Sequence, residues 1–212
     1  MFAIIDYGMG NVRSIYNAFT LLGKEVTITD DPKIIAESEA IILPGVGAFS
    51  DAMNNLTNKG LIEVLQNEII VKKKPYLGIC LGLELLAEKS HEGGIFPGLG
   101  WLKGQVVKIQ SQQSSVKVPH IGWDDTKIIK NDILFNEIVE PSYYYLHSYY
   151  LKLNPDEKNI TTSTCEYGGV EIVSSIHKEN IFATQFHPEK SQETGLKLLK
   201  NFIEWVTQNV EK

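Results

Sequence analysis

The sequence predicts an α/β protein with three layers: a mostly parallel central sheet, helices on both faces, and additional antiparallel strands in its second half. The first half alternates short apolar runs with amphipathic stretches, the pattern of parallel strands linked by helices. The second half has β-rich segments joined by short turns, which is typical of antiparallel strands. We find no internal repeat and no long linker, so we expect residues 1–212 to form a single domain.

The first half is predicted to alternate strand and helix from its first residues. We expect the strands at 2–5, 25–29, 40–43 and 75–79. Asn11 is expected to cap a helix that runs to Leu22 and ends at Gly23, where a left-handed residue is favoured. Pro32 opens a short helix, and further helices are expected at 49–58, at 61–72 and after residue 79.

The second half is predicted to contain mainly strands and one closing helix. The β-rich segments are 105–109, 116–118, 143–153, 161–165, 171–176 and 181–186. The polar stretch 110–115 reads as a loop or hairpin tip. Residues 193–210 carry apolar side chains at helical spacing, which predicts an amphipathic helix.

Composition excludes several classes of protein. The chain is 43% hydrophobic and has a net charge of -6, so a nucleic-acid surface or an anionic membrane partner is not expected. Its apolar runs are shorter than a membrane span requires, and its first residues read as a strand, not as a signal peptide. Cys80 and Cys165 form neither a disulfide framework nor a metal-ligand spacing. We therefore expect a cytoplasmic protein without metal or cofactor.

Cys80 lies in Gly78-Ile-Cys-Leu-Gly82, which has the G-x-C-x-G pattern of a nucleophile elbow. A lone cysteine is more often a small buried apolar residue. The glycines at the end of a predicted parallel strand favour a nucleophile here, because larger side chains would crowd a tight strand-to-helix turn. The helix that follows would favour the thiolate, and the amide of Leu81 is a ready oxyanion donor. Cys165 has no such surroundings and is expected to have no chemical role.

A thiol nucleophile needs a base, and His187 is the best placed of the five histidines. It ends an apolar strand in Gln185-Phe-His-Pro-Glu189, where Pro188 favours an extended backbone. In that geometry Glu189 points the same way and can orient the imidazole. Two other histidines, His91 and His177, are expected at the surface.

The loop Pro44-Gly-Val-Gly47 follows another buried strand. The backbone amides of Val46 and Gly47 can approach a small substrate and supply a second oxyanion donor beside Leu81. The loop lacks the pattern of a phosphate-binding loop. From these residues alone, a stand-alone cysteine hydrolase or a thiol-redox protein stays open, although redox chemistry lacks a resolving cysteine.

Six stretches together resemble the class I (triad) glutamine amidotransferases, and among them the glutaminase subunits of imidazole glycerol phosphate synthase. The resemblance extends from end to end of the chain and implies a flavodoxin-like fold. The stretches are Ile4-Ile-Asp-Tyr-Gly-Met-Gly-Asn11, Pro44-Gly-Val-Gly47, Gly78-Ile-Cys-Leu-Gly82, Val118-Pro-His-Ile-Gly-Trp123, Tyr145-Leu-His-Ser-Tyr149 and Gln185-Phe-His-Pro-Glu-Lys-Ser191.

The resemblance implies a role for each matching residue. Cys80 would be the nucleophile toward glutamine, His187 the base and Glu189 its orienting carboxylate. Substrate contacts would come from Gly47, Glu84, Ser148 and Tyr149, and contacts to a partner subunit from Asn11, Pro119, His120 and Trp123. That partner would be a (β/α)8-barrel cyclase that uses the ammonia to make imidazole glycerol phosphate and an aminoimidazole carboxamide ribotide, in histidine biosynthesis.

Two positions depart from the family pattern, which usually has glutamine at position 84 and asparagine at position 124. This chain has Glu84 and Asp124. An ionised Glu84 cannot donate a hydrogen bond and would disfavour a nearby thiolate. Two alternatives therefore stay open: a glutaminase that feeds a different synthase, such as one amidating surface sugars, and a catalytically weak interaction subunit.

Overall fold

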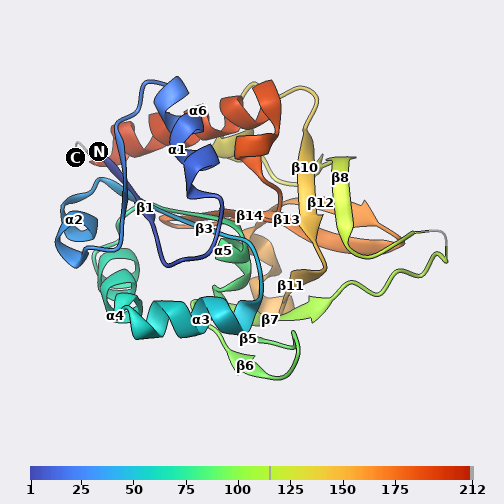
Figure 1. Cartoon of the computed structure of the whole chain (residues 1–212). Helices are drawn as coiled ribbons and strands as arrows, with labels where there is room; N and C mark the ends of the chain where they lie inside the picture. Colours follow the sequence, from blue (N-terminus) through green and yellow to red (C-terminus); the bar gives the residue numbers. More distant parts are fainter. Residues whose placement is uncertain (115, 211–212) are drawn as a thin grey trace.

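The protein is built around an eight-stranded sheet, seen in a computed structural model that describes residues 1–114 and 116–210. The strand order is β2-β1-β3-β4-β14-β13-β12-β9 (Figure 1). Strands β2 to β14 in this order pair in parallel, and the last three are antiparallel. The strands are β1 (Phe2–Ile5), β2 (Val26–Thr29), β3 (Ala40–Gly45), β4 (Tyr76–Cys80), β9 (Lys127–Ile128), β12 (Thr161–Tyr167), β13 (Val170–Lys178) and β14 (Ile181–Thr184).

Helices cover both faces of this sheet, because the inner strands are apolar on both sides. In β1, Phe2 and Ile4 face one core while Ala3 and Ile5 face the other. The first core is closed by α1 (Val12–Leu21) and α6 (Gln192–Val210), and the second by α2 (Pro32–Glu37), α3 (Phe49–Asn58) and α4 (Leu61–Leu65) (Figure 1). This arrangement confirms the predicted three layers.

The predicted helix ends are found at α1 and differ at α4. The Asn11 side chain accepts a hydrogen bond from the Ser14 amide at 3.3 Å, and Gly23 has a φ of 76°. The predicted helix 61–72 changes its hydrogen bonding at Gln66, where a π-helical turn, η1 (Gln66–Val71), continues α4.

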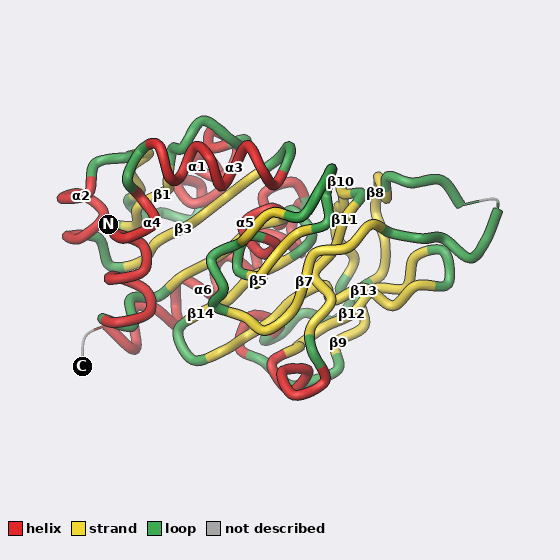
Figure 2. Tube along the Cα trace, turned by 90° about the horizontal axis from the view of Figure 1, so that it is seen from below, coloured by secondary structure: helices red, strands yellow, loops and turns green. Residues whose placement is uncertain are grey.

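Two smaller sheets are attached at the side of the central one. The four-stranded sheet has the order β11-β7-β5-β6 and the two-stranded sheet pairs β10 with β8. Figure 2 shows β5, β7 and β11 side by side, and residues 110–114 and 116–118, between β7 and β8, projecting from the body. The strands are β5 (Ala87–Ser90), β6 (Phe96–Pro97), β7 (Leu102–Lys108), β8 (His120–Asp125), β10 (Ser142–His147) and β11 (Tyr149–Leu153).

Several strand predictions for the second half were wrong in detail. The single β-rich segment predicted at 143–153 is two strands separated by Ser148, because β10 and β11 pair into different sheets. The strand predicted at 116–118 is absent, and the chain becomes extended only at His120, where β10 supplies a partner. Short 3-10 turns complete the chain at η2 (Ile133–Phe135), η3 (Pro155–Ile160) and η4 (Pro188–Lys190).

The helix predicted after Cys80 is only four residues long, α5 (Leu81–Glu84), and gives way to β5. The four apolar residues that follow Gly82 here, Leu83, Leu85, Leu86 and Ala87, are all fully buried. A segment without an exposed face does not favour a longer amphipathic helix. Within the part of the chain that the structure describes, no helix is long and apolar enough to cross a membrane.

The topology gathers three loops at one edge of the sheet. Strands β3, β4 and β14 are parallel neighbours that end at Gly45, Cys80 and Thr184. Open α/β sheets bind their ligands at the carboxyl ends of such strands. The segments after these three strands carry the residues that the sequence singles out.

Candidate active site

Cys80 occupies a strained turn between β4 and α5. Its φ and ψ are 56° and -108°, which L residues rarely adopt. A Cβ at Gly82 would lie 1.9 Å from the Leu43 carbonyl oxygen, and one at Gly78 would lie 2.7 Å from the Gly82 oxygen. The sheet and the turn thus leave no room for a side chain at either glycine, as the sequence predicts.

His187 and Glu189 form a buried pair after β14. The ring donates from Nδ1 to Glu189 Oε1 at 2.9 Å, and the two side chains are only 3% and 1% exposed. A carboxylate accepts only, so the proton is on Nδ1 and Nε2 is left as the basic atom. His187 Nε2 is buried and has no hydrogen-bond partner among residues 1–114 and 116–210. This geometry leaves the imidazole oriented with its basic nitrogen free to accept a proton.

The backbone around His187 is fixed by Ser191 and Tyr144. Ser191 Oγ donates to the His187 carbonyl at 2.7 Å and accepts from the Tyr144 amide at 2.9 Å. The His187 amide donates in turn to the Tyr144 carbonyl at 2.9 Å. Gly195 of α6 allows close approach behind this loop, because a Cβ there would lie 1.9 Å from the Pro188 oxygen.

The charge state of His187 depends on Cys80. Burial by itself lowers the pKa of His187, but the negative charge of a Cys80 thiolate and the bond to Glu189 raise it to about 10. A Cys80 thiolate and Glu189 therefore both favour the imidazolium form of His187. In the uncharged form, the Cys80 thiol donates toward the Leu146 carbonyl, with 3.7 Å between sulfur and oxygen.

A cavity of about 310 Å³ opens over Cys80. All seven residues that the sequence proposes for oxyanion stabilisation, substrate contact and nucleophilic attack line it, while His187 and Glu189 are buried beside Cys80. The lining residues are Val46, Gly47, Cys80, Leu81, Glu84, Glu92, Pro119, Leu146, His147, Ser148 and Tyr149. Gly47 has a φ of 111°, so its backbone conformation is one that favours glycine.

Glu84 is the more buried of the two carboxyl side chains that line this cavity, only 5% exposed. It accepts a hydrogen bond from Gln185 Nε2 at 2.9 Å. Burial raises the pKa of Glu84 to about 8, although the Gln185 bond and His187 lower it. At neutral pH the carboxyl group is therefore mainly protonated and can donate.

Three residues near the cavity had no predicted role. Gln185 was part of a matched motif, but only the fold shows that its amide reaches Glu84 over 101 positions of sequence. Glu92 accepts from the Phe49 amide at 2.7 Å and so holds the loop after β3. His147 donates from Nδ1 to the Tyr149 carbonyl at 2.8 Å, and burial lowers its pKa to about 3, so it is no rival to His187 as base.

The residues predicted to meet a partner fall into two groups. Asn11, Pro119 and Trp123 are exposed, and Trp123 and its neighbour Ile121 are 49% and 57% exposed. His120 is the exception, because its side chain is 2% exposed and its ring stacks between Tyr145 and Tyr167. Its side chain is not available as a surface contact.

The other histidines include one wrong prediction. His91 is exposed, as expected, and bonds Gln105 at 2.9 Å. His177 is half-buried: it donates to Asp132 Oδ2 at 2.6 Å and its ring stacks on Phe182, because β13 places it beneath α6.

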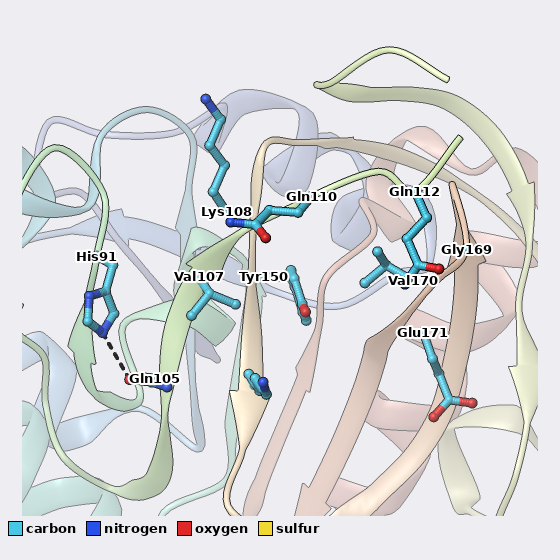
Figure 3. A pocket seen from close by; sticks show the side chains of 11 residues that line it. His91, Gln105, Val107, Lys108, Gln110, Gln112, Tyr150, Gly169, Val170 and Glu171 are labelled. Carbon is cyan, nitrogen blue, oxygen red and sulfur yellow. Dashed lines mark hydrogen bonds between the residues drawn. The ribbon is translucent and has the colours of Figure 1, made fainter. Parts of the chain in front are cut away.

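A second hollow of about 750 Å³ lies over β7, β11 and β13 (Figure 3). His91, Lys108, Tyr150 and Glu171 are among the side chains around it. It is open and polar, and none of the residues proposed for the triad or the substrate lines it. The chemistry therefore belongs to the cavity over Cys80.

Comparisons with known proteins agree with this site. Residues 3–205 match the family described as Glutamine amidotransferase class-I. Among solved structures, PurLQS from Thermotoga maritima aligns with a TM-score of 0.73 at 20% identity, covering 96% of this chain and 97% of that one. A glutamine amidotransferase from the same organism aligns with a TM-score of 0.63 at 19% identity, covering 99% of this chain and 83% of that one. At such identities these two structures show the shared fold.

Curated relatives that align over nearly their whole length have a higher sequence identity to this chain than the two solved structures. Imidazole glycerol phosphate synthase subunit HisH of Caldanaerobacter subterraneus is 48% identical over 207 residues, 97% of this chain and 98% of its own. HisH of Geobacter sulfurreducens is 45% identical over 207 residues, 95% and 97%. HisH 1 of Campylobacter jejuni strain 81-176 is 44% identical over 203 residues, 95% and 98%. The chain therefore belongs to the class I glutamine amidotransferase family, among its HisH subunits.

Proposed function

We propose that this chain, as one domain spanning residues 1–212, is the glutaminase subunit of an imidazole glycerol phosphate synthase. The observation that carries the proposal is the cavity over Cys80, where the strained nucleophile elbow, the Val46–Gly47 loop and the Ser148–Tyr149 backbone converge. The oriented His187–Glu189 pair supports it. The similarity to HisH subunits over nearly the whole chain supports the particular synthase.

The reaction begins with the Cys80 thiolate and the His187 imidazolium. The sulfur attacks the side-chain amide carbon of glutamine, and the C=O electron pair moves onto oxygen. Backbone amides of Leu81 and of the Val46–Gly47 loop stabilise that oxyanion. His187 then gives its proton to the departing nitrogen, and ammonia leaves a glutamyl thioester on Cys80.

Hydrolysis of the thioester uses the same groups in reverse order. His187 takes a proton from water, which attacks the thioester carbon and releases glutamate and the thiolate. Glu189 holds the ring tautomer and stabilises the imidazolium in both halves of the cycle. Since Cys80 must remain a free thiol, we expect the enzyme to work in the reducing cytoplasm.

Free ammonia is rapidly protonated in neutral water and loses its nucleophilicity, so it must pass directly to an acceptor. We propose a heterodimer with a (β/α)8-barrel cyclase, which uses the ammonia to make imidazole glycerol phosphate and an aminoimidazole carboxamide ribotide. Asn11, Pro119 and Trp123 are candidate contacts. Pro119 also lines the cavity over Cys80, so such a partner would cover its entrance.

The test is glutamate release from glutamine with and without a purified barrel cyclase. We expect the cyclase to stimulate release, and Cys80→Ser to lower it at least about 10³-fold. Stable binding without any release would instead favour an interaction subunit. Release that only a different synthase stimulates would favour another ammonia acceptor, and hydrolysis of esters or peptides without glutaminase activity would overturn the proposal.

A further inference from the structure

Three side chains with metal-binding atoms converge outside the cavity over Cys80. His120 and Asp124 lie on the same face of β8, and Cys165 comes from the neighbouring β12. One ligand atom from each residue lies within 4.8 Å of the other two. His120 and Cys165 are each 2% exposed, whereas the Asp124 side chain is 35% exposed.

The ring of His120 is held in one orientation by aromatic neighbours. Tyr145 stacks on it with centroids 4.6 Å apart and planes 14° apart, and Tyr167 stacks with centroids 3.9 Å apart and planes 18° apart. This sandwich fixes where the two ring nitrogens point. Nδ1 lies 3.1 Å from His147 Nε2, and Nε2 lies 3.3 Å from Asp124 Oδ2.

Hydrogen bonding determines which nitrogen of His120 carries the proton. The Tyr149 carbonyl can only accept, so His147 donates to it from Nδ1 and its own Nε2 is an acceptor. His120 must then donate to His147 from Nδ1. The remaining nitrogen, Nε2, presents a lone pair toward the Asp124 carboxylate. Metal-ligating histidines show this arrangement, with the other ring N–H donated to an acceptor behind.

The distance between His120 Nε2 and Asp124 Oδ2 also favours a shared cation. At 3.3 Å it is longer than the roughly 2.7–2.9 Å of a charge-assisted N–H···O bond. Two ligands bound tetrahedrally at about 2.0–2.1 Å lie about 3.3–3.4 Å apart. The pair therefore has the spacing of one edge of a tetrahedral site.

We propose that His120 Nε2, Asp124 Oδ2 and Cys165 Sγ bind a zinc ion. One nitrogen, one oxygen and one thiolate suit Zn²⁺ and not Mg²⁺ or Ca²⁺, which prefer oxygen ligands. A water molecule entering from the exposed side of Asp124 completes four ligands. On binding, the Cys165 thiol loses its proton to solvent and forms the Zn–S bond.

The ion adds a link between two sheets that a hydrogen bond already connects, because Tyr145 of β10 donates to Ser174 Oγ of β13 at 2.8 Å. It ties β8, and through it the β8–β10 ribbon, to β12 of the central sheet. None of the three ligands lines the cavity over Cys80. The site is structural, and it does not depend on the proposed glutaminase function. The sequence predicts no metal because its cysteines have no ligand spacing; the fold supplies the spacing.

The test uses Co²⁺ as a spectroscopic substitute for Zn²⁺ in tag-free Cys80→Ser protein. The chain has two cysteines, so any thiolate-to-cobalt absorption in this variant comes from Cys165. We expect about one equivalent of Co²⁺ to produce a thiolate charge-transfer band with tetrahedral d–d bands, and one equivalent of Zn²⁺ to remove them. Zinc should also raise the unfolding temperature.

Variants of the three ligands, made in the Cys80→Ser protein, distinguish Co²⁺ binding by all three side chains from binding by the Cys165 thiolate alone. Cys165→Ser should abolish the charge-transfer band, and Asp124→Asn and His120→Gln should each weaken Co²⁺ binding at least tenfold. Asp125→Asn, which changes the exposed neighbouring carboxylate, is the matched control and should leave affinity unchanged. Absence of the band, its survival in Cys165→Ser, or unchanged affinity in both other ligand variants would overturn the proposal.

One measurement needs no ligand variant and so does not depend on how they fold. X-ray absorption of the zinc-loaded Cys80→Ser protein should show one sulfur at about 2.3 Å and three nitrogen or oxygen ligands at about 2.0–2.2 Å. A zinc shell without sulfur would exclude the site.

Discussion

Glu84 combines a buried position with an ionisable side chain, at a position where the resemblance to the glutaminase subunits predicts an amide. Its carboxyl group contacts Gln185, and the charged or titratable groups that act on it are Glu92 and His187. Protonated, Glu84 offers one donor and one acceptor, much as a glutamine would. The departure from the family pattern thus preserves the hydrogen-bonding capacity of the cavity below the pKa of this group.

We predict that Glu84→Gln broadens the alkaline side of the pH profile. Wild-type kcat/KM for glutamine should fall as pH rises through about 8, where Glu84 ionises and places a negative charge in the cavity that holds the thiolate. The variant should stay within about threefold of wild type at pH 7 and keep its activity at pH 9. Glu63→Gln, on the exposed side of α4, is the control and should retain the wild-type profile.

The same substitution should affect stability in a pH-dependent way. The pKa of Glu84 is raised in the folded state, so the folded protein binds this proton more tightly and loses that advantage as pH rises. Glu84→Gln should therefore raise the unfolding temperature more at pH 8 than at pH 5. Equal shifts at both pH values, together with identical activity profiles, would mean that Glu84 titrates normally.

The elbow between β4 and α5 requires backbone atoms of β3 to approach Gly82 so closely that no side chain fits there. Gly82 is not among the residues with positive φ, so the obstacle to a side chain there is steric: an added Cβ would lie 1.9 Å from the Leu43 carbonyl oxygen and 3.0 Å from its carbon. Close packing of this kind lets β3 and β4 present their loops to one cavity.

We predict that Gly82→Ala destabilises the protein by about 3 kcal/mol, because the Cβ must displace backbone. Chemical denaturation measures this change. Gly23→Ala is the control: its Cβ meets nothing within 4 Å, so only the cost of its positive φ, about 1–2 kcal/mol, should appear. Similar losses in both variants would contradict a steric role for Gly82.

The position of the turn η4 depends on Ser191, whose hydroxyl group is hydrogen-bonded to the backbone of both His187 and Tyr144. Ser191→Ala should leave a backbone carbonyl and a backbone amide without these partners and cost about 2 kcal/mol. It should lower kcat more than it raises KM, since His187 loses its position while the cavity is unchanged. Ser191→Thr, which keeps the hydroxyl, should restore part of the kcat; loss of stability without any change in kcat would argue against a positioning role.

At the scale of the whole molecule, two exposed apolar side chains follow Pro119 along the chain, and Pro119 lines the cavity over Cys80. Ile121 and Trp123 stand out from β8, next to Pro119 at the cavity itself. We predict that Trp123→Ala weakens binding to the cyclase by about 10- to 100-fold, as expected for an aromatic side chain that becomes buried in the interface. Binding measured by calorimetry should be unchanged in Val139→Ala, which alters a 90% exposed apolar residue that lies outside this group.

Sequence and structure agree best where short-range rules apply. Helix α1 begins after Asn11 and ends before Gly23 as predicted, because capping and a left-handed φ are local preferences. Agreement fails at 83–87, where complete burial favours a short helix followed by a strand, and at 143–153, where two sheets divide one β-rich run. His177 was misplaced for the same reason, since its contacts come from Asp132 and Phe182.

The sequence by itself determined the chemical groups of this protein: a cysteine between two glycines, a histidine followed two residues later by glutamate, and glycine loops at the ends of parallel strands. These features depend on local geometry and on side-chain chemistry, which are determined by residues close together in the sequence. Only the tertiary structure decided that Gln185 meets Glu84, that His120 is buried, and that Cys165 lies beside His120 and Asp124. Burial and contact between distant strands set these facts, because proximity and the protonation state of buried groups depend on how the whole chain packs.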